Sequence, residues 1–137
     1  MELLGQIVAI AAVAFFVLMT AMRVALGRKA RAMTGTALPV LPGAVGQRVA
    51  NSRHALVYFF SPSCGACRAI TPRVRALEAT NPSVFAVDVT RSPDLARALN
   101  VMATPSTVEI TDGTISGYHV GPIPEAVLAR FTGALPG

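Results

Sequence analysis

The chain has 137 residues, of which 53% are hydrophobic and 14% are charged, and its formal net charge is +5. With an apolar N-terminal stretch set aside, roughly 85 residues remain, which is enough for one domain with a modest core. The sequence contains no internal repeat, no Gly-rich phosphate loop and no carboxylate pair, so it indicates neither a repeat architecture nor phosphate or paired-carboxylate chemistry.

A segment of twenty residues without a charge, Leu3–Met22, lies near the N-terminus. A helix of this length measures about 30 Å, which matches the hydrocarbon core of a bilayer. Only Gln6 and Thr20 are clearly polar, so the helix lacks the polar face that a helix in a globular core shows. A cleaved signal peptide fits poorly, because the two residues before the segment include no basic one. We expect residues 1–26 to form a transmembrane anchor that contacts membrane lipid through residues 3–22.

Four basic residues follow this segment closely: Arg23, Arg28, Lys29 and Arg31. They supply most of the net charge, so the basic balance needs no nucleic-acid partner. Basic flanks stay on the cytoplasmic side, which predicts a single-pass protein of the cell membrane, such as the bacterial inner membrane, with a cytoplasmic domain.

Residues 27–46 form a basic juxtamembrane segment and linker in this interpretation, and residues 47–137 form the domain. Gly, Pro, Ala and Thr are frequent from Thr34 to Gly46. A short edge strand over Thr36–Leu41 and a truncated helix over Val45–Asn51 are the alternatives to a flexible tether there.

The first clear element of the domain is the apolar run Leu56–Phe60, which predicts a buried strand. Ser61-Pro62-Ser63 ends it, and the only two cysteines, Cys64 and Cys67, follow before helical spacing starts at Arg68. A C-x-x-C pair at a strand–helix junction is typical of a dithiol/disulfide redox centre. The partial positive charge of the helix N-terminus would stabilise the thiolate of the first cysteine, which is the attacking species in disulfide exchange.

Two other interpretations of the cysteines remain open. A zinc site would need two more ligands, and the two histidines, His54 and His119, have no common zinc spacing; we expect both at the surface or an edge. A purely structural disulfide would close a very small loop and stabilise little. No metal is therefore expected.

Further elements follow in order. The helix from Arg68 to Glu78 contains Pro72 and turns Val74 and Leu77 inward, with Ala76 as a further inward candidate. We then expect a strand over Val84–Val89, a helix over Asp94–Leu99 capped by Ser92, strands Thr107–Thr111 and Ile115–Val120 joined by an Asp112-Gly113 hairpin turn, and a closing helix over Pro124–Phe131.

From about Ala55 to Thr132 the chain resembles the thioredoxin family. The resemblance rests on Cys64-Gly65-Ala66-Cys67, on Pro72 eight residues after Cys64, on Thr104-Pro105, and on the hairpin leading to Gly121. It implies an α/β thioredoxin-like fold, with a central mixed sheet flanked by helices, after the transmembrane helix.

The resemblance also implies roles for residues. Cys64 would be the nucleophile and Cys67 the resolving cysteine, with Gly65 and Ala66 forming the active-site loop between them. Thr104, Pro105 and Gly121 would shape the substrate groove, with a cis bond before Pro105. Protein thiols and disulfides would be the partners, and the disulfide itself would serve in place of a cofactor.

The sequence departs from thioredoxin around the cysteines. It has no tryptophan, Ser63 precedes Cys64, and Ala66 replaces the proline between the cysteines. Tyr58 occupies the position of the buried family aspartate, and Ala86 that of its lysine partner. Asp88 is a weak substitute for the missing acid, and Arg68 is either a solvated side chain or a charge that favours a thiolate.

The predicted function is that of a membrane-anchored thiol–disulfide oxidoreductase involved in cell redox homeostasis. The alternative is a thioredoxin-fold adaptor or maturation factor for a membrane or redox-enzyme complex, and a third hypothesis is an oxidase or isomerase. Many tethered relatives face the oxidising side, so an extracytoplasmic domain is the alternative location. The sequence gives neither the direction of electron flow nor the oligomeric state.

Overall fold

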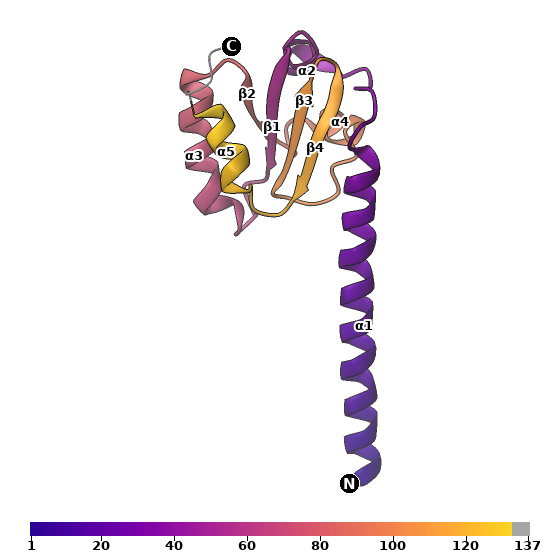
Figure 1. Ribbon diagram of the computed structural model, residues 1–137. Coiled ribbons are helices and arrows are strands. Elements are labelled where there is room, and N and C mark those ends of the chain that lie inside the picture. The colour runs from indigo at the N-terminus through magenta and orange to yellow at the C-terminus, as the bar shows by residue number, and fades with distance from the viewer. Residues whose placement is uncertain (133–137) are drawn as a thin grey trace.

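The computed structural model describes residues 1–132 and shows a small α/β domain on one long N-terminal helix (Figure 1). Residues 133–137, the end of the predicted domain, lie outside the described residues. In chain order the elements are α1 (Glu2–Met33), α2 (Gly43–Ala50), β1 (His54–Phe60), α3 (Cys67–Thr80), β2 (Val84–Asp88), α4 (Pro93–Ala98), β3 (Ser106–Thr111), β4 (Thr114–Val120) and α5 (Glu125–Phe131).

The four strands form one mixed sheet in the order β2-β1-β3-β4. β1 pairs with β2 in parallel and with β3 antiparallel, and β3 and β4 form an antiparallel hairpin. The predicted turn is confirmed, since Asp112 and Gly113 have φ values of 48° and 73°, as a two-residue type I′ turn requires. The carboxyl ends of β1 and β4 and the start of β3 therefore meet at one end of the sheet.

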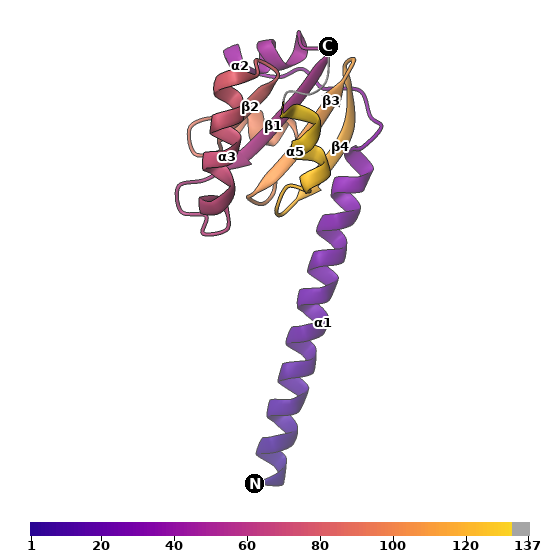
Figure 2. The ribbon, with the colours of Figure 1, turned by 60° about the vertical axis from the view of Figure 1, so that its left-hand side comes forward.

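Alternate side chains of β1 enter two separate cores, because successive residues of a strand point to opposite faces. Ala55, Val57 and Phe59 pack with residues of α2 and α4. Leu56, Tyr58 and Phe60 pack instead under α3 and α5, which lie together on the other face (Figure 2).

Each predicted helix forms, with some differences at single residues. Pro72 lies inside α3 and Val74 is fully buried. Ala76 is exposed, so its expected inward position is wrong: Val74 and Leu77 alone supply the apolar contacts of that part of α3. Ser92 occupies the N-cap position of α4, but its side chain makes no cap hydrogen bond.

The region between α1 and β1 is more ordered than a free tether. The truncated helix is confirmed as α2, whereas the edge strand reduces to a single antiparallel bridge between Ala37 and Thr114. The amide of Gly35 donates to the carbonyl of Ile115 at 2.7 Å, and the amide of Ile115 donates to the carbonyl of Thr36 at 2.9 Å. These bonds hold the chain along the edge strand β4.

α1 is a single helix of 32 residues, or about 48 Å. Among residues 1–132 it is the one helix that is long and apolar enough to cross a membrane, by length and composition. It continues to Met33, seven residues beyond the predicted end of the anchor at residue 26, because its last turns pack against β4.

Candidate active site

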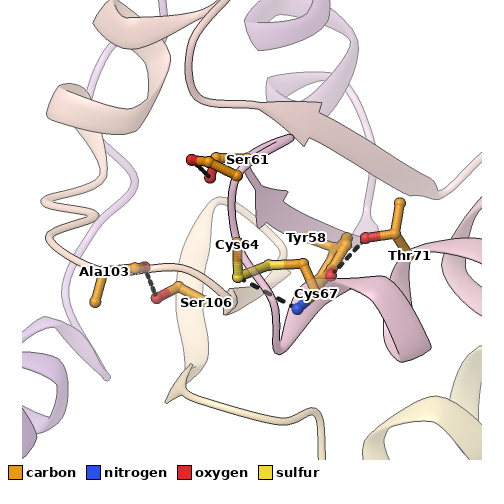
Figure 3. The surroundings of a disulfide bond; sticks show 8 residues. Tyr58, Ser61, Cys64, Cys67, Thr71, Ala103 and Ser106 are labelled. Carbon is orange, nitrogen blue, oxygen red and sulfur yellow. Dashed lines mark hydrogen bonds between the residues drawn. A yellow bond between two sulfur atoms is a disulfide. The ribbon is translucent and has the colours of Figure 1, made fainter.

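The two cysteines form a disulfide in the connection between β1 and α3 (Figure 3). Their Cα atoms are 5.3 Å apart. A tight turn produces this proximity: the amide of Cys64 donates to the carbonyl of Ser61 at 3.2 Å, and the amide of Arg68 donates to the carbonyl of Gly65 at 3.3 Å. α3 then starts at Cys67, so both sulfur atoms lie at a helix N-terminus, as the sequence indicated.

The two sulfurs differ in their access to solvent. Cys67 is 2% exposed, whereas Cys64 is half-buried. The backbone N–H of Cys67 donates to the Sγ atom of Cys64 at 3.2 Å. A donor aimed at this sulfur, together with the helix N-terminus, favours a thiolate on Cys64 once the disulfide is reduced. The geometry therefore gives the accessible sulfur the properties of an attacking group.

An open hollow of about 390 Å³ lies over the disulfide, with Pro62 and Pro72 among its lining residues. Its charged side chains are the arginines Arg68 and Arg75, and the guanidinium of Arg75 lies 5.1 Å from the ring centroid of Phe60. No carboxylate lines this hollow among the described residues. These two cations favour a thiolate over a thiol in the hollow, although Arg75 also interacts with the carboxylate of Asp88 outside it.

Tyr58 lies at the position where thioredoxins carry a buried acid. Its side chain is fully buried, and its hydroxyl lies 2.9 Å from the Oγ1 atom of Thr71. Burial raises the pKa of the Tyr58 phenol, although the hydrogen bond with Thr71 lowers it in part. The phenol is therefore protonated at neutral pH and does not accept the proton of Cys67.

Asp88, the weak substitute for the missing acid, and Glu78 both bind backbone groups away from the disulfide. The carboxylate of Asp88 accepts hydrogen bonds from the amide and the hydroxyl of Thr90, which lower the pKa of Asp88. The carboxylate of Glu78, on α3, accepts a hydrogen bond from the amide of Ala86 at 3.1 Å. This bond satisfies a free amide of the edge strand β2.

The predicted groove residues lie at the same end of the sheet as the disulfide. The Thr104–Pro105 peptide bond is cis, and Pro105 is buried. The amide of Gly121 donates to the carbonyl of Pro105 at 2.8 Å, and Gly121 has a φ of +97°, which favours glycine. Phe59 pairs with Ser106, so the loop before β3 adjoins the end of β1. Their role in binding substrate stays a prediction.

Sequence reasoning missed Thr71, which lines the same hollow as the two cysteines and is hydrogen-bonded with Tyr58. Thr71 follows Cys67 by four residues, one helical turn, and this spacing is the signal that would have found it. The histidines lie away from the hollow: the ring of His54 packs 5.3 Å from that of Phe131, and His119 is hydrogen-bonded with Glu109 at 3.0 Å. Among residues 1–132 there is no group of three or more potential metal-binding side chains.

Comparison with known proteins agrees with this geometry. A family profile described as Thioredoxin matches residues 42–134. A disulfide bond formation protein of Brevibacillus choshinensis is 34% identical over 102 residues, which cover 71% of this chain and 86% of that protein. Thioredoxin-2 of Pyricularia oryzae is 34% identical over 86 residues, 61% of this chain and 50% of that protein. The crystal structure of Fasciola hepatica thioredoxin is similar with a TM-score of 0.50 at 31% identity, over 64% of this chain and 85% of that one.

Proposed function

Because the chain belongs to the thioredoxin family, we propose that it is a membrane-anchored oxidoreductase that exchanges electrons with protein thiols and disulfides. The predicted thioredoxin-like fold is confirmed, and the family consists of thiol–disulfide oxidoreductases. The observation that carries the proposal is the Cys64–Cys67 disulfide at the start of α3, with one accessible and one buried cysteine.

The proposed reaction divides the work between the two sulfurs. The thiolate of Cys64 attacks one sulfur of a substrate disulfide, forms a mixed disulfide and releases the other substrate sulfur as a thiolate. The thiolate of Cys67 then attacks the Sγ atom of Cys64, which releases the second substrate sulfur and restores the Cys64–Cys67 disulfide. Two electrons pass to the substrate, whose thiolates take up two protons from solvent. The reverse sequence oxidises a substrate dithiol.

The residues around the disulfide would assist this exchange without a cofactor. The amide of Cys67 and the arginines Arg68 and Arg75 would hold the Cys64 thiolate at neutral pH. Gly65 and Ala66 would set the turn between the sulfurs. Thr104, Pro105 and Gly121 would form the groove in which an extended substrate segment lies.

Covalent trapping tests the division of roles. Without Cys67 the mixed disulfide has no resolving thiol, so Cys67→Ala is expected to accumulate covalent complexes with substrate proteins. Cys64→Ala is the matched control, since it keeps one cysteine of the pair but removes the accessible one. The complexes are resolved on non-reducing gels. Equal trapping by the two variants would contradict the assignment of nucleophile and resolving cysteine.

We propose that residues 3–22 of α1 cross the membrane and that the basic residues after them keep the domain in the cytoplasm. Labelling of Cys64 with a membrane-impermeant thiol reagent in intact cells, after brief reduction, tests this location. Protection from the reagent until the cells are permeabilised is expected. Labelling in intact cells would place the domain outside the cytoplasmic membrane.

Tyr58 stands where the family has a buried aspartate. This replacement favours a second candidate function, an adaptor for a membrane or redox-enzyme complex. A protonated Tyr58 cannot deprotonate Cys67 as a carboxylate would. An adaptor would retain its cellular function in the Cys64→Ser/Cys67→Ser double variant, whereas the oxidoreductase would lose it. A null phenotype of this variant, produced at the normal level, would eliminate the adaptor.

A further inference from the structure

The orientation of the domain relative to α1 carries information about the substrate. α1 runs as one helix from Glu2 to Met33. The side chains of its uncharged part are exposed, and the basic residues begin at Arg23, directly after that part. With residues 3–22 in a bilayer, the lipid boundary on the side of the domain therefore lies near Arg23.

The end of α1 is fixed to the domain by several contacts. The Nδ2 group of Asn100 donates to the Sδ atom of Met33 at 3.4 Å. Past the helix, Gly35 and Thr36 bond with both backbone groups of Ile115, and the amide of Leu38 donates to the carbonyl of Gly113 at 2.9 Å. The helix and β4 are in direct contact. The direction of the helix thus sets the direction in which the domain faces.

The side chains beside the exit of α1 are neighbours of the predicted substrate groove. Leu26 and Lys29 line a small cavity together with Met102, Ala103 and Val120. Met102 and Ala103 directly precede Thr104-Pro105, and Val120 directly precedes Gly121. Since Leu26 is four residues beyond Met22, it lies about 6 Å above the end of the uncharged segment.

The active-site end of the domain therefore faces the bilayer. Figures 1 and 2 both show the connection between β1 and α3, and the start of α5, on the side toward which α1 runs to its N-terminus. The opposite end carries the Asp112-Gly113 turn and an exposed ion pair between Arg53 and Asp112 at 3.5 Å. The end that faces the bilayer exposes two apolar side chains beside the exit of α1, Met102 at 66% and Val120 at 44%.

We propose that the substrates are membrane-embedded proteins whose reactive cysteines lie at the lipid–water boundary. This proposal rests on the proposed function of Cys64 and Cys67, which it makes specific. Leu26 and Lys29 lie about 6 and about 10 Å above the end of the uncharged segment and line one cavity with Met102 and Val120. A groove at this height reaches a cysteine pair close to a transmembrane segment. The exposed Met102 and Val120 suit the apolar residues that flank such a pair. A large water-soluble substrate would meet the bilayer before it could enter the groove.

The first experiment measures the orientation without using the activity. The chain contains no tryptophan, so single tryptophans can be introduced as probes. Met102→Trp reports on the active-site end, and Asn51→Trp, at an exposed position before β1, reports on the opposite end. The full chain is reconstituted in vesicles with nitroxide-labelled lipid headgroups. Strong quenching at position 102 and little at position 51 are expected; equal quenching, or stronger quenching at position 51, would overturn the orientation.

The second experiment tests the substrate class. A seven-residue polar helical insert between Arg23 and Val24 raises the domain by about 10 Å and nearly preserves the helix face. The same insert between Glu2 and Leu3 is the matched control, since it does not move the domain relative to the lipid. Each reduced protein in vesicles is mixed with one disulfide-containing peptide in two forms. One form is fused directly to a membrane-spanning helix, and the other is soluble.

The three proteins are expected to differ in their rate of exchange with the anchored peptide but not with the soluble one. The unchanged chain and the control insert exchange with the anchored peptide faster than the raised domain does, by about tenfold. All three proteins exchange equally with the soluble peptide. Unchanged exchange of the raised domain with both peptides would overturn the substrate class and leave the proposed function intact. Failure of all three proteins to exchange with either peptide would remove the proposed function, and the substrate class with it.

Discussion

The two faces of the sheet share four strands but differ in what they bury. On the face covered by α2 and α4, β1 contributes only apolar side chains. On the face covered by α3 and α5, the same strand contributes Tyr58, and β3 contributes Thr107 and Glu109. This face also holds the buried Cys67. The first face is mainly apolar, with Ser106 as a buried polar side chain beside Phe59, whereas the second face buries Thr107, Glu109 and Cys67.

The polar face also holds an unusual buried group. The hydroxyl of Thr107 is buried and, among the described residues, has no hydrogen-bond partner. Thr107 pairs with Tyr58 across β1 and β3, so this hydroxyl lies on the same face as the residues beneath the disulfide. A buried polar group without a partner costs free energy, which the domain recovers from the apolar face. We therefore expect substitutions on the apolar face to change the free energy of unfolding without changing the rate of disulfide exchange.

The largest effect is expected from Phe59→Ala. Phe59 is fully buried in the apolar face, and its truncation should lower the free energy of unfolding by about 3–5 kcal/mol. Val40→Ala is the control, because Val40 is 95% exposed and should change little. Urea unfolding of the full chain in detergent measures both variants. A change in the exchange rate of the folded Phe59→Ala protein would show that the two faces are not separable.

The next effect concerns the polar face. Glu109 accepts a hydrogen bond from Arg130 at 2.6 Å and is bonded with His119, and a Cβ atom on Gly117 would overlap its carboxylate. Gly117→Ala and Glu109→Ala should each lower the free energy of unfolding by about 1–3 kcal/mol. The double variant should cost less than the sum, because the new methyl then fills the space of the removed carboxylate. Additive costs in urea unfolding would contradict this packing.

Local signals predicted most of the fold that surrounds the site. The apolar run of β1, the Asp112-Gly113 turn and the apolar spacing of α5 are patterns within a few residues, and each element forms where it was expected. The pair Cys64 and Cys67 at a strand–helix junction is equally local, so sequence placed the disulfide correctly.

Features that depend on distant contacts could not be predicted in the same way. The extension of α1 to Met33 follows from its packing on β4, about eighty residues later in the chain. The inward position of Glu109 depends on Arg130 and Gly117, which reach it from α5 and β4. Glu78 points toward β2 because this edge strand has a free amide at Ala86, which donates to the Glu78 carboxylate. That amide is free because of the strand order in the sheet, which the helix sequence does not reveal.

The ionisation of the two tyrosines, one on each face, compares the two faces at high pH. Tyr118 packs against the apolar core and Tyr58 lies in the polar one, and burial raises the pKa of both phenols, that of Tyr118 to about 12. Above pH 10 the unfolded chain loses these protons first. The contribution of the two tyrosines to the free energy of unfolding is therefore constant below pH 10 and falls as the pH rises toward 12.

Phenolate absorbance follows this titration in the folded protein. Since the chain has only two tyrosines, Tyr118→Phe should leave the single step of Tyr58, and Tyr58→Phe the single step of Tyr118. Both steps are expected above pH 10. A step at or below pH 10 in the Tyr118→Phe variant would mean that Tyr58 ionises as readily as an exposed tyrosine, and the polar face would then be open to water.

The smallest effect is expected from Arg73→Ala, although Arg73 joins the two helices that cover the polar face. Its guanidinium donates two hydrogen bonds to the carboxylate of Glu125, at 2.8 and 3.0 Å, and both side chains are exposed. The hydrogen bonds and charge of Arg73 lower the pKa of Glu125, so any stabilisation is present at neutral pH and is lost as the pH falls through the pKa of Glu125. Because solvent screens such a pair, we expect no measurable change in the urea midpoint of Arg73→Ala at neutral pH. The pKa of Glu125, followed by NMR, should rise to its ordinary value in this variant. A loss of stability as large as that of Phe59→Ala would mean that charge, rather than the packing of Val127, Leu128 and Phe131 of α5, holds this face together.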